Sequence, residues 1–150
     1  MTTKELAKEN AAKLAKIYDI GTHPQIINHL GIEFLEFSGD KMVARMPVDE
    51  RTVQPLGLLH GGASCVLAET LGSIGATINA GEGKVAVGIE INANHLRSAV
   101  KGYVTGTSKP IKAGKTIQVW ECNISDDDGN LVCVSRLTVA IRDYKKVPNK

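Results

Sequence analysis

The chain is poor in aromatic residues and carries almost no net charge. Phe, Trp and Tyr make up 4% of its 150 residues, and the formal net charge is +2. So small a charge argues against a dedicated nucleic-acid-binding protein, which usually has a strong basic bias. The sequence also lacks repeats, low-complexity tracts and linker-like stretches. We therefore expect one globular domain, large enough to bury a real core.

Cysteine is scarce as well. The chain has three cysteines, far apart and outside any Cys-x-x-Cys motif. This usage is typical of reduced, partly buried cysteines in a cytosolic protein. These residues are Cys65, Cys122 and Cys133. The histidines His23, His29, His60 and His95 lack a short ligand spacing, so the sequence predicts no metal site.

No long uninterrupted apolar run is present. Residues 1–20 are polar and helical in pattern, without the apolar core of a signal peptide. Residues 63–80 approach the length of a membrane span, but Glu69, Gly72, Gly75 and several hydroxyls interrupt them. A buried core helix fits this composition better than a spanning one. We expect a cytoplasmic protein without a membrane or nucleic-acid partner.

Local patterns predict the order of elements along the chain. Residues 4–18 have an amphipathic helical pattern. Segments 31–37 and 41–48 alternate as strands around the turn Ser38-Gly39-Asp40. A loop leads to the apolar helix over 63–80, which Gly81-Glu82-Gly83 ends. The remaining strand-like runs are 85–95, 102–111, 116–125 and 131–142.

The predicted fold class is α+β. A helix that is apolar on nearly all sides must be covered broadly, and a curved antiparallel sheet of about six strands wrapped around it achieves this. We divide the chain into an N-terminal helical extension over residues 1–24 and one domain over residues 25–150.

The start of the apolar helix is the most informative stretch. The turn His60-Gly61-Gly62 supplies bare backbone N–H groups and the positive end of a helix dipole. Glu69 places one carboxylate in the middle of the same helix. A carboxylate together with oxyanion-binding N–H groups suits acyl-transfer chemistry. By itself, Glu69 could equally be a buried residue satisfied by a neighbouring hydroxyl or amide.

A linked set of segments resembles the hotdog-fold acyl-CoA thioesterases. The resemblance spans roughly residues 25–142 and is closest to the branch acting on aryl-CoA thioesters, including 1,4-dihydroxy-2-naphthoyl-CoA of menaquinone biosynthesis. It implies the hotdog fold and hydrolysis of an acyl-CoA to a free acid and CoA. The matching segments are Met-Pro-Val-Asp (46–49), Gln-Pro-Leu-Gly-Leu-Leu-His-Gly-Gly-Ala-Ser (54–64), Leu-Ala-Glu (67–69), Gly-Ser (72–73) and Gly-Ile-Glu-Ile-Asn-Ala-Asn-His (88–95).

The resemblance implies a role for each catalytic candidate. Glu69 attacks the thioester to give a mixed anhydride, or it activates a water; sequence leaves both open. The Gly61 amide is the oxyanion donor, where glycine permits close approach. His60 has a positioning role, and Gln54 matches a polar residue near the substrate carbonyl. Ser73, one turn beyond Glu69, orients the water or the carboxylate, unless it bonds back to the carbonyl of residue 69.

Helix geometry predicts that the site is shared between subunits. Gly61 and Glu69 are eight residues apart, about 12 Å along the helix axis at a rise of about 1.5 Å per residue. Glu69 can therefore hardly serve a carbonyl held at the start of its own helix. Antiparallel helices from two subunits would solve this, and the resemblance implies that arrangement. We expect an obligate homodimer, paired into a homotetramer as in this branch.

The resemblance also marks residues for the CoA moiety, whose phosphates call for a basic rim. CoA belongs to the substrate, so no cofactor is expected. Each lysine, taken alone, is more often a solvated charge. The residues are Gly88 near the pantetheine path, then His95, Leu96, Arg97 and Ser98, and finally Lys112, Ala113, Gly114, Lys115, Thr116 and Ile117.

Two alternatives stay open at this level. One is a proofreading thioesterase that acts on an aryl-carrier protein. The other is a non-catalytic hotdog protein that binds acyl-CoA. A hydratase is disfavoured because the aspartates fall in turns, at the helix start or at the chain end. Among aromatic substrates, the sequence does not choose between menaquinone biosynthesis, aromatic degradation and general CoA recycling.

Overall fold

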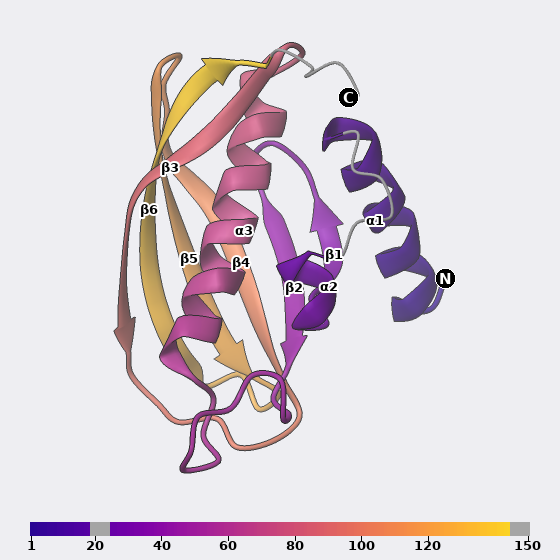
Figure 1. The fold of residues 1–150 in the computed structure, drawn as a ribbon, viewed down its shortest axis with the longest axis vertical. Helices are drawn as coiled ribbons and strands as arrows, with labels where there is room; N and C mark the ends of the chain where they lie inside the picture. The colour runs from indigo at the N-terminus through magenta and orange to yellow at the C-terminus, as the bar shows by residue number, and fades with distance from the viewer. Residues whose placement is uncertain (19–24, 145–150) are drawn as a thin grey trace.

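The computed structural model describes residues 1–18 and 25–144 of the chain. One six-stranded antiparallel sheet, in the order β1-β2-β4-β5-β6-β3, curves around the long helix α3 (Gly61–Ala80) (Figure 1). The strands are β1 (Glu33–Phe37), β2 (Met42–Pro47), β3 (Lys84–His95), β4 (Tyr103–Ala113), β5 (Ile117–Asp126) and β6 (Leu131–Asp143). This is the hotdog arrangement, and it confirms the α+β prediction.

The predicted helices and strands begin and end within two residues of the observed ones. The short helix α2 (Ile26–His29) was not predicted, because four residues are too few to show a helical period. The hairpin alternation is confirmed: Met42, Ala44 and Met46 are 0% exposed, whereas Val43 and Arg45 between them are only half-buried.

Two glycines let the sheet approach α3 closely. A Cβ on Gly75 would stand 2.6 Å from Cζ3 of Trp120, and a Cβ on Gly72 would stand 2.6 Å from Cδ2 of Leu137. The Trp120 ring is fully buried and donates from Nε1 to Gln118 Oε1 at 2.9 Å. The glycines that interrupt the apolar run are therefore contact points between the helix and the strands that wrap it.

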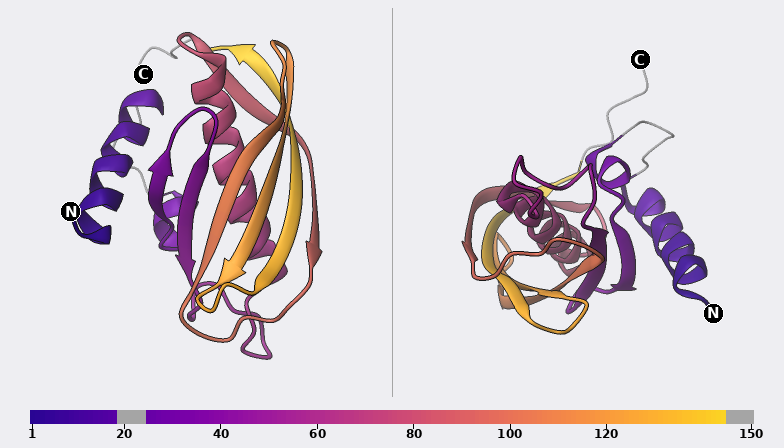
Figure 2. Two further views of the ribbon diagram at one scale, coloured as in Figure 1. Left: turned by 180° about the vertical axis from the view of Figure 1, so that it is seen from behind. Right: turned by 90° about the horizontal axis from the view of Figure 1, so that it is seen from below.

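The N-terminal helix α1 (Thr3–Tyr18) lies beside β1, outside the curved sheet (Figure 2). Its Asn10 is 2% exposed and donates from Nδ2 to the Phe34 carbonyl at 3.1 Å. Since β1 is the last strand on that side of the sheet, α1 occupies a free edge. The helix confirms the helical pattern expected over residues 4–18, and residues 19–24 lie outside the described residues.

Candidate active site

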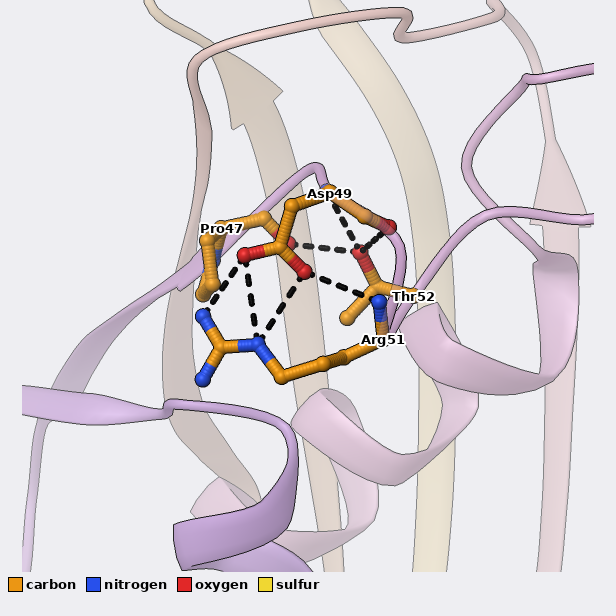
Figure 3. Close-up of polar contacts among 4 residues, drawn as sticks. All are labelled: Pro47, Asp49, Arg51 and Thr52. Carbon is orange, nitrogen blue, oxygen red and sulfur yellow. Dashed lines mark hydrogen bonds and ion pairs between the residues drawn. The ribbon is translucent and has the colours of Figure 1, made fainter.

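The loop before α3 is held by a polar cluster (Figure 3). Thr52 donates from Oγ1 to the Pro47 carbonyl at 2.7 Å and accepts the Asp49 N–H at 3.1 Å. Asp49 accepts hydrogen bonds from the Arg51 guanidinium, which holds the pKa of that carboxyl below its usual range. The Thr52 carbonyl in turn accepts the His60 N–H at 2.8 Å. The cluster thus fixes the position from which α3 begins.

His60 caps α3 and leaves one N–H group free. Its Nδ1 accepts the Gly62 N–H at 2.8 Å, and its carbonyl accepts the N–H groups of Ala63 and Ser64 at 2.9 and 3.3 Å. The Gly61 N–H has no acceptor among residues 1–18 and 25–144. A free N–H at the positive end of a helix dipole is a ready anion-binding group. It lies where the sequence predicts the oxyanion donor.

Gln54 is held with its amide nitrogen available. Its side-chain oxygen accepts a short hydrogen bond from the Leu56 N–H. Its own main chain closes a tight loop, accepting the Gly57 N–H at 2.8 Å and donating to the Leu58 carbonyl at 2.8 Å. Because the carbonyl oxygen is used locally, the side chain offers its NH₂ group as a donor.

A hollow of about 360 Å³ opens at the start of α3. Its walls combine the apolar side chains of Leu58, Leu59 and Val132 with polar groups from three segments. The polar set includes Gln54, Gly61, Ser64, His95, Arg97 and Ser98, and Leu96 also lines the hollow. The structure therefore brings together one half of the predicted site: Gln54, Gly61 and the His95–Ser98 segment, with His60 adjoining.

His95 and Gly61 are in direct contact. A Cβ on Gly61 would stand 2.8 Å from Nε2 of His95, the last residue of β3. Glycine at position 61 is thus required for the imidazole to rest against the start of the helix. The contact joins a predicted substrate-binding residue to the predicted oxyanion donor.

Glu69 lies farther along α3, over Gly88 of β3. Its Oε1 stands 2.6 Å from the place a Cβ on Gly88 would occupy. Glu69 is exposed in the single chain, so the alternative of a buried glutamate satisfied by a neighbouring hydroxyl or amide is wrong for one chain alone. Ser73 is half-buried, and its hydroxyl makes no hydrogen bond within the described parts of the chain. The back-bond to residue 69 that competed with a functional role is therefore not formed.

The remaining CoA candidates are at the other end of α3. Ala113, Gly114 and Lys115 line a second hollow of about 380 Å³, together with Asn79, Ala80, Lys84, Gln118 and Ile141. Asn79 and Ala80 end the helix of 20 residues, so this hollow lies about 25–30 Å along α3 from its start. Lys112 and Ile117 are exposed on β4 and β5. One chain alone does not join the two halves of the predicted substrate site.

The cysteines are free, as expected, but two of them are fully buried rather than half-buried. Burial and the nearby Glu69 carboxylate raise the pKa of the Cys65 thiol. A thiol that stays protonated is a poor nucleophile, so Glu69 rather than Cys65 stays the candidate catalytic residue.

Within the described segments, no cluster of three or more His, Cys, Asp and Glu side chains could hold a metal ion. No helix in that part of the chain is long and apolar enough to cross a membrane.

Sequence reasoning missed Ser64 and Thr77. Ser64 lies inside a segment that matches the family. A serine next to a glycine turn does not by itself indicate a functional residue, so the sequence alone did not single it out. Thr77 accepts the Ala86 N–H at 3.0 Å and donates to the Ser73 carbonyl at 2.9 Å. It ties α3 to β3 next to Gly88, a contact between residues nine apart in sequence that no local pattern predicts.

A free N–H at the start of a helix wrapped by a hotdog sheet, with a carboxylate exposed on that helix, is typical of a thioester hydrolase. The chain belongs to the thioesterase superfamily, which it matches over residues 56–133. It is 54% identical over 117 residues to the 1,4-dihydroxy-2-naphthoyl-CoA hydrolase of Escherichia coli, covering 77% of this chain and 85% of the relative.

Two further comparisons agree. The proofreading thioesterase EntH of Cronobacter turicensis is 47% identical over 116 residues, covering 77% of this chain and 85% of that protein. The crystal structure of a thioesterase from Haemophilus influenzae superposes with a TM-score of 0.82 at 42% identity, covering 99% of this chain and 96% of that one. The chain is a thioester hydrolase.

Proposed function

We propose that the protein hydrolyses an aromatic acyl-CoA to a free acid and CoA, at a site completed by two subunits. The free Gly61 N–H carries this proposal, since the cap formed by His60 uses the neighbouring N–H groups and leaves this one. The relative named 1,4-dihydroxy-2-naphthoyl-CoA hydrolase supports the aromatic CoA thioester as substrate.

The start of α3 holds the thioester. The carbonyl oxygen accepts the Gly61 N–H, and this bond strengthens as negative charge develops on the oxygen. His60 Nδ1 is engaged by Gly62, so a neutral ring has its proton on Nε2, which is available to the substrate. The Gln54 NH₂ group is a further donor beside the hollow.

The carboxylate comes from the partner subunit's copy of the same helix. Glu69 lies two turns beyond Gly61 in its own chain, about 12 Å away along the axis, which favours action across the interface. It either attacks the thioester carbon, expelling the thiolate and leaving an anhydride that water cleaves, or it takes a proton from the attacking water. Ser73, whose hydroxyl has no hydrogen-bond partner among the described residues, orients the carboxylate or that water.

The free edge of β3 supports the shared site. Within the described residues, this strand has no neighbouring strand on its outer side, and it exposes Val87 by 52% and Ile89 by 57%. Unpaired strand edges and exposed apolar side chains favour pairing with another chain. Joining two copies along β3 would enclose Glu69, which lies over Gly88. It would also bring the Lys112–Ile117 segment of one subunit toward the His95–Ser98 segment of the other. The same chemistry is compatible with pairing of dimers into a tetramer.

The first test measures free-thiol release from benzoyl-CoA, 1,4-dihydroxy-2-naphthoyl-CoA and a fatty acyl-CoA. We expect the aromatic thioesters to be hydrolysed fastest. Glu69→Gln should lower kcat by about 10²–10⁴-fold, the usual worth of a positioned acid or base. Glu9→Gln removes the same charge from α1, far from the site, and is the control that should stay active.

Each contrary result has a distinct meaning. Full activity in Glu69→Gln would overturn the catalytic assignment, and a preference for the fatty acyl-CoA would overturn the aromatic substrate. Hydrolysis of an acylated aryl-carrier protein, but of no CoA thioester, would favour the proofreading role suggested by the similarity to EntH. Binding of acyl-CoA without any turnover would contradict catalysis altogether.

A further inference from the structure

The buried face of α3 begins with a hydroxyl. Ser64 is 1% exposed and lines the hollow at the start of the helix. The positions that follow it on this face, Leu67, Ala68 and Leu71, are apolar and form part of the core. Ser64 is thus a polar group at the boundary between the core and the hollow.

This hydroxyl is unpaired. The backbone N–H of Ser64 donates to the His60 carbonyl at 3.3 Å. Its Oγ makes no hydrogen bond to any residue in 1–18 or 25–144. Among the described residues, Ser135 Oγ is the fully buried side-chain oxygen without a partner, so Ser64 Oγ keeps an opening to the hollow that Ser64 lines. A ligand in the hollow would supply the missing partner.

The position of Ser64 indicates which part of a ligand it meets. It follows Gly61 by three residues, so both lie on the same side of the helix, about 4.5 Å apart along the axis. Leu58, Leu59 and Val132 form the apolar walls of the same hollow. Because Gly61 and Ser64 line the same hollow, an acyl group whose thioester oxygen is held at Gly61 lies within reach of the Ser64 hydroxyl.

We propose that Ser64 is a specificity-determining residue that hydrogen-bonds a hydroxyl on the aromatic ring of the acyl group. This inference rests on the proposed function, because it requires an aromatic acyl group at the Gly61 N–H. Ser64 makes the enzyme prefer hydroxylated aromatic thioesters over unsubstituted ones, since only the former offer its hydroxyl a partner within the hollow.

The test compares kcat/KM for 2-hydroxybenzoyl-CoA, 3-hydroxybenzoyl-CoA and benzoyl-CoA in the wild type and in Ser64→Ala. Ser64→Cys keeps the size of the side chain with a much weaker donor, and serves if the alanine variant folds poorly. Ser135→Ala is a matched control. Ser135 is 3% exposed, and its Oγ is fully buried without a partner in the described chain, but it does not line the hollow.

In the wild type we expect at least one hydroxybenzoyl thioester to be preferred. Ser64→Ala and Ser64→Cys should reduce that preference by about 2- to 10-fold, the worth of one neutral hydrogen bond, and Ser135→Ala should leave it unchanged. An equal loss on all three substrates would overturn the inference, because it would mean that Ser64 serves the thioester or the pantetheine arm. An unchanged preference would overturn it too. A wild type inactive on all three would overturn the proposed function as well.

Discussion

At the residue scale, the glycines of this site make room for other side chains. Gly61 leaves space for the imidazole of His95, and Gly88 leaves space for the carboxylate of Glu69. Each glycine thus sets the place of a functional group that comes from a different element. Neither position has a left-handed φ, so close approach, rather than backbone freedom, explains the residue type.

Gly88→Ala tests this view. The added Cβ would stand 2.6 Å from Glu69 Oε1, so the carboxylate must move. Displacement of a reacting group by about 1 Å can cost about 10²-fold in rate, and we expect a fall in kcat of that order. Thermal unfolding should change little, because residue 88 is exposed.

A double variant supplies the control. If Gly88→Ala acts by moving Glu69, it should have little further effect in a Glu69→Gln background, since contacting residues are not additive. Full additivity of the two changes in kcat would contradict the contact.

At the element scale, α3 serves as both core and catalytic scaffold. Ten of its residues are buried, while its first N–H and its only carboxylate remain accessible. The loop cluster around Thr52 fixes where the helix starts, and the Thr77 hydroxyl fixes β3 against its second half. The positions of the catalytic candidates on α3 therefore depend on residues, such as Thr52 and Thr77, that lie outside the candidate site.

Gly75→Ala should destabilise the fold. Alanine is the better helix former by about 1 kcal/mol. However, its Cβ would stand 2.6 and 2.7 Å from two Trp120 ring atoms and 3.0 Å from Met42 Cγ. The ring cannot yield easily, because it is fully buried and hydrogen-bonded to Gln118. Overpacking costs about 1–3 kcal/mol, and after the gain of about 1 kcal/mol in helix propensity we expect the free energy of unfolding in urea to fall by up to about 2 kcal/mol.

Gly72→Ala is the matched comparison one turn earlier. Its Cβ would meet only Cδ2 of Leu137 at close range, the far end of a flexible side chain that can rotate away. We expect this variant to lose less stability than Gly75→Ala. The reverse order would show that packing at Trp120 does not limit the helix.

At the scale of the whole molecule, the two edges of the sheet differ. The β1 edge is covered by α1 through Asn10, whereas no strand of the described chain pairs with the outer edge of β3 beside Glu69. A sheet with one covered edge and one open edge favours pairing of two copies in a closed way. By covering the β1 edge, the N-terminal helix α1 leaves the β3 edge for the pairing that the proposed shared active site requires.

Ile89→Lys should separate the subunits. Ile89 is 57% exposed at the β-bulge of β3, and a lysine there opposes edge-to-edge pairing. Light scattering should show monomers, and the hydrolysis rate should fall because neither half of the site is then complete. Ile26→Lys, at a residue 53% exposed on α2, introduces the same charge elsewhere and should leave the oligomer intact. A monomeric wild type with full activity would contradict the shared site.

The amino-acid sequence was sufficient to predict the strands, the long helices, the fold class and the candidate catalytic residues. Hydrophobic periodicity and glycine turns act over a few residues, so they are visible in the chain, from the strand of Met42 to the helix that follows His60. The links among Gly61, Glu69 and the CoA candidates were not visible in that way. The folded structure was needed to show that Gly61 lies against His95, that Glu69 lies over Gly88, and that Lys115 lies at the opposite end of α3. These contacts join residues distant in sequence, and they depend on how a curved sheet wraps one helix, which no local pattern encodes.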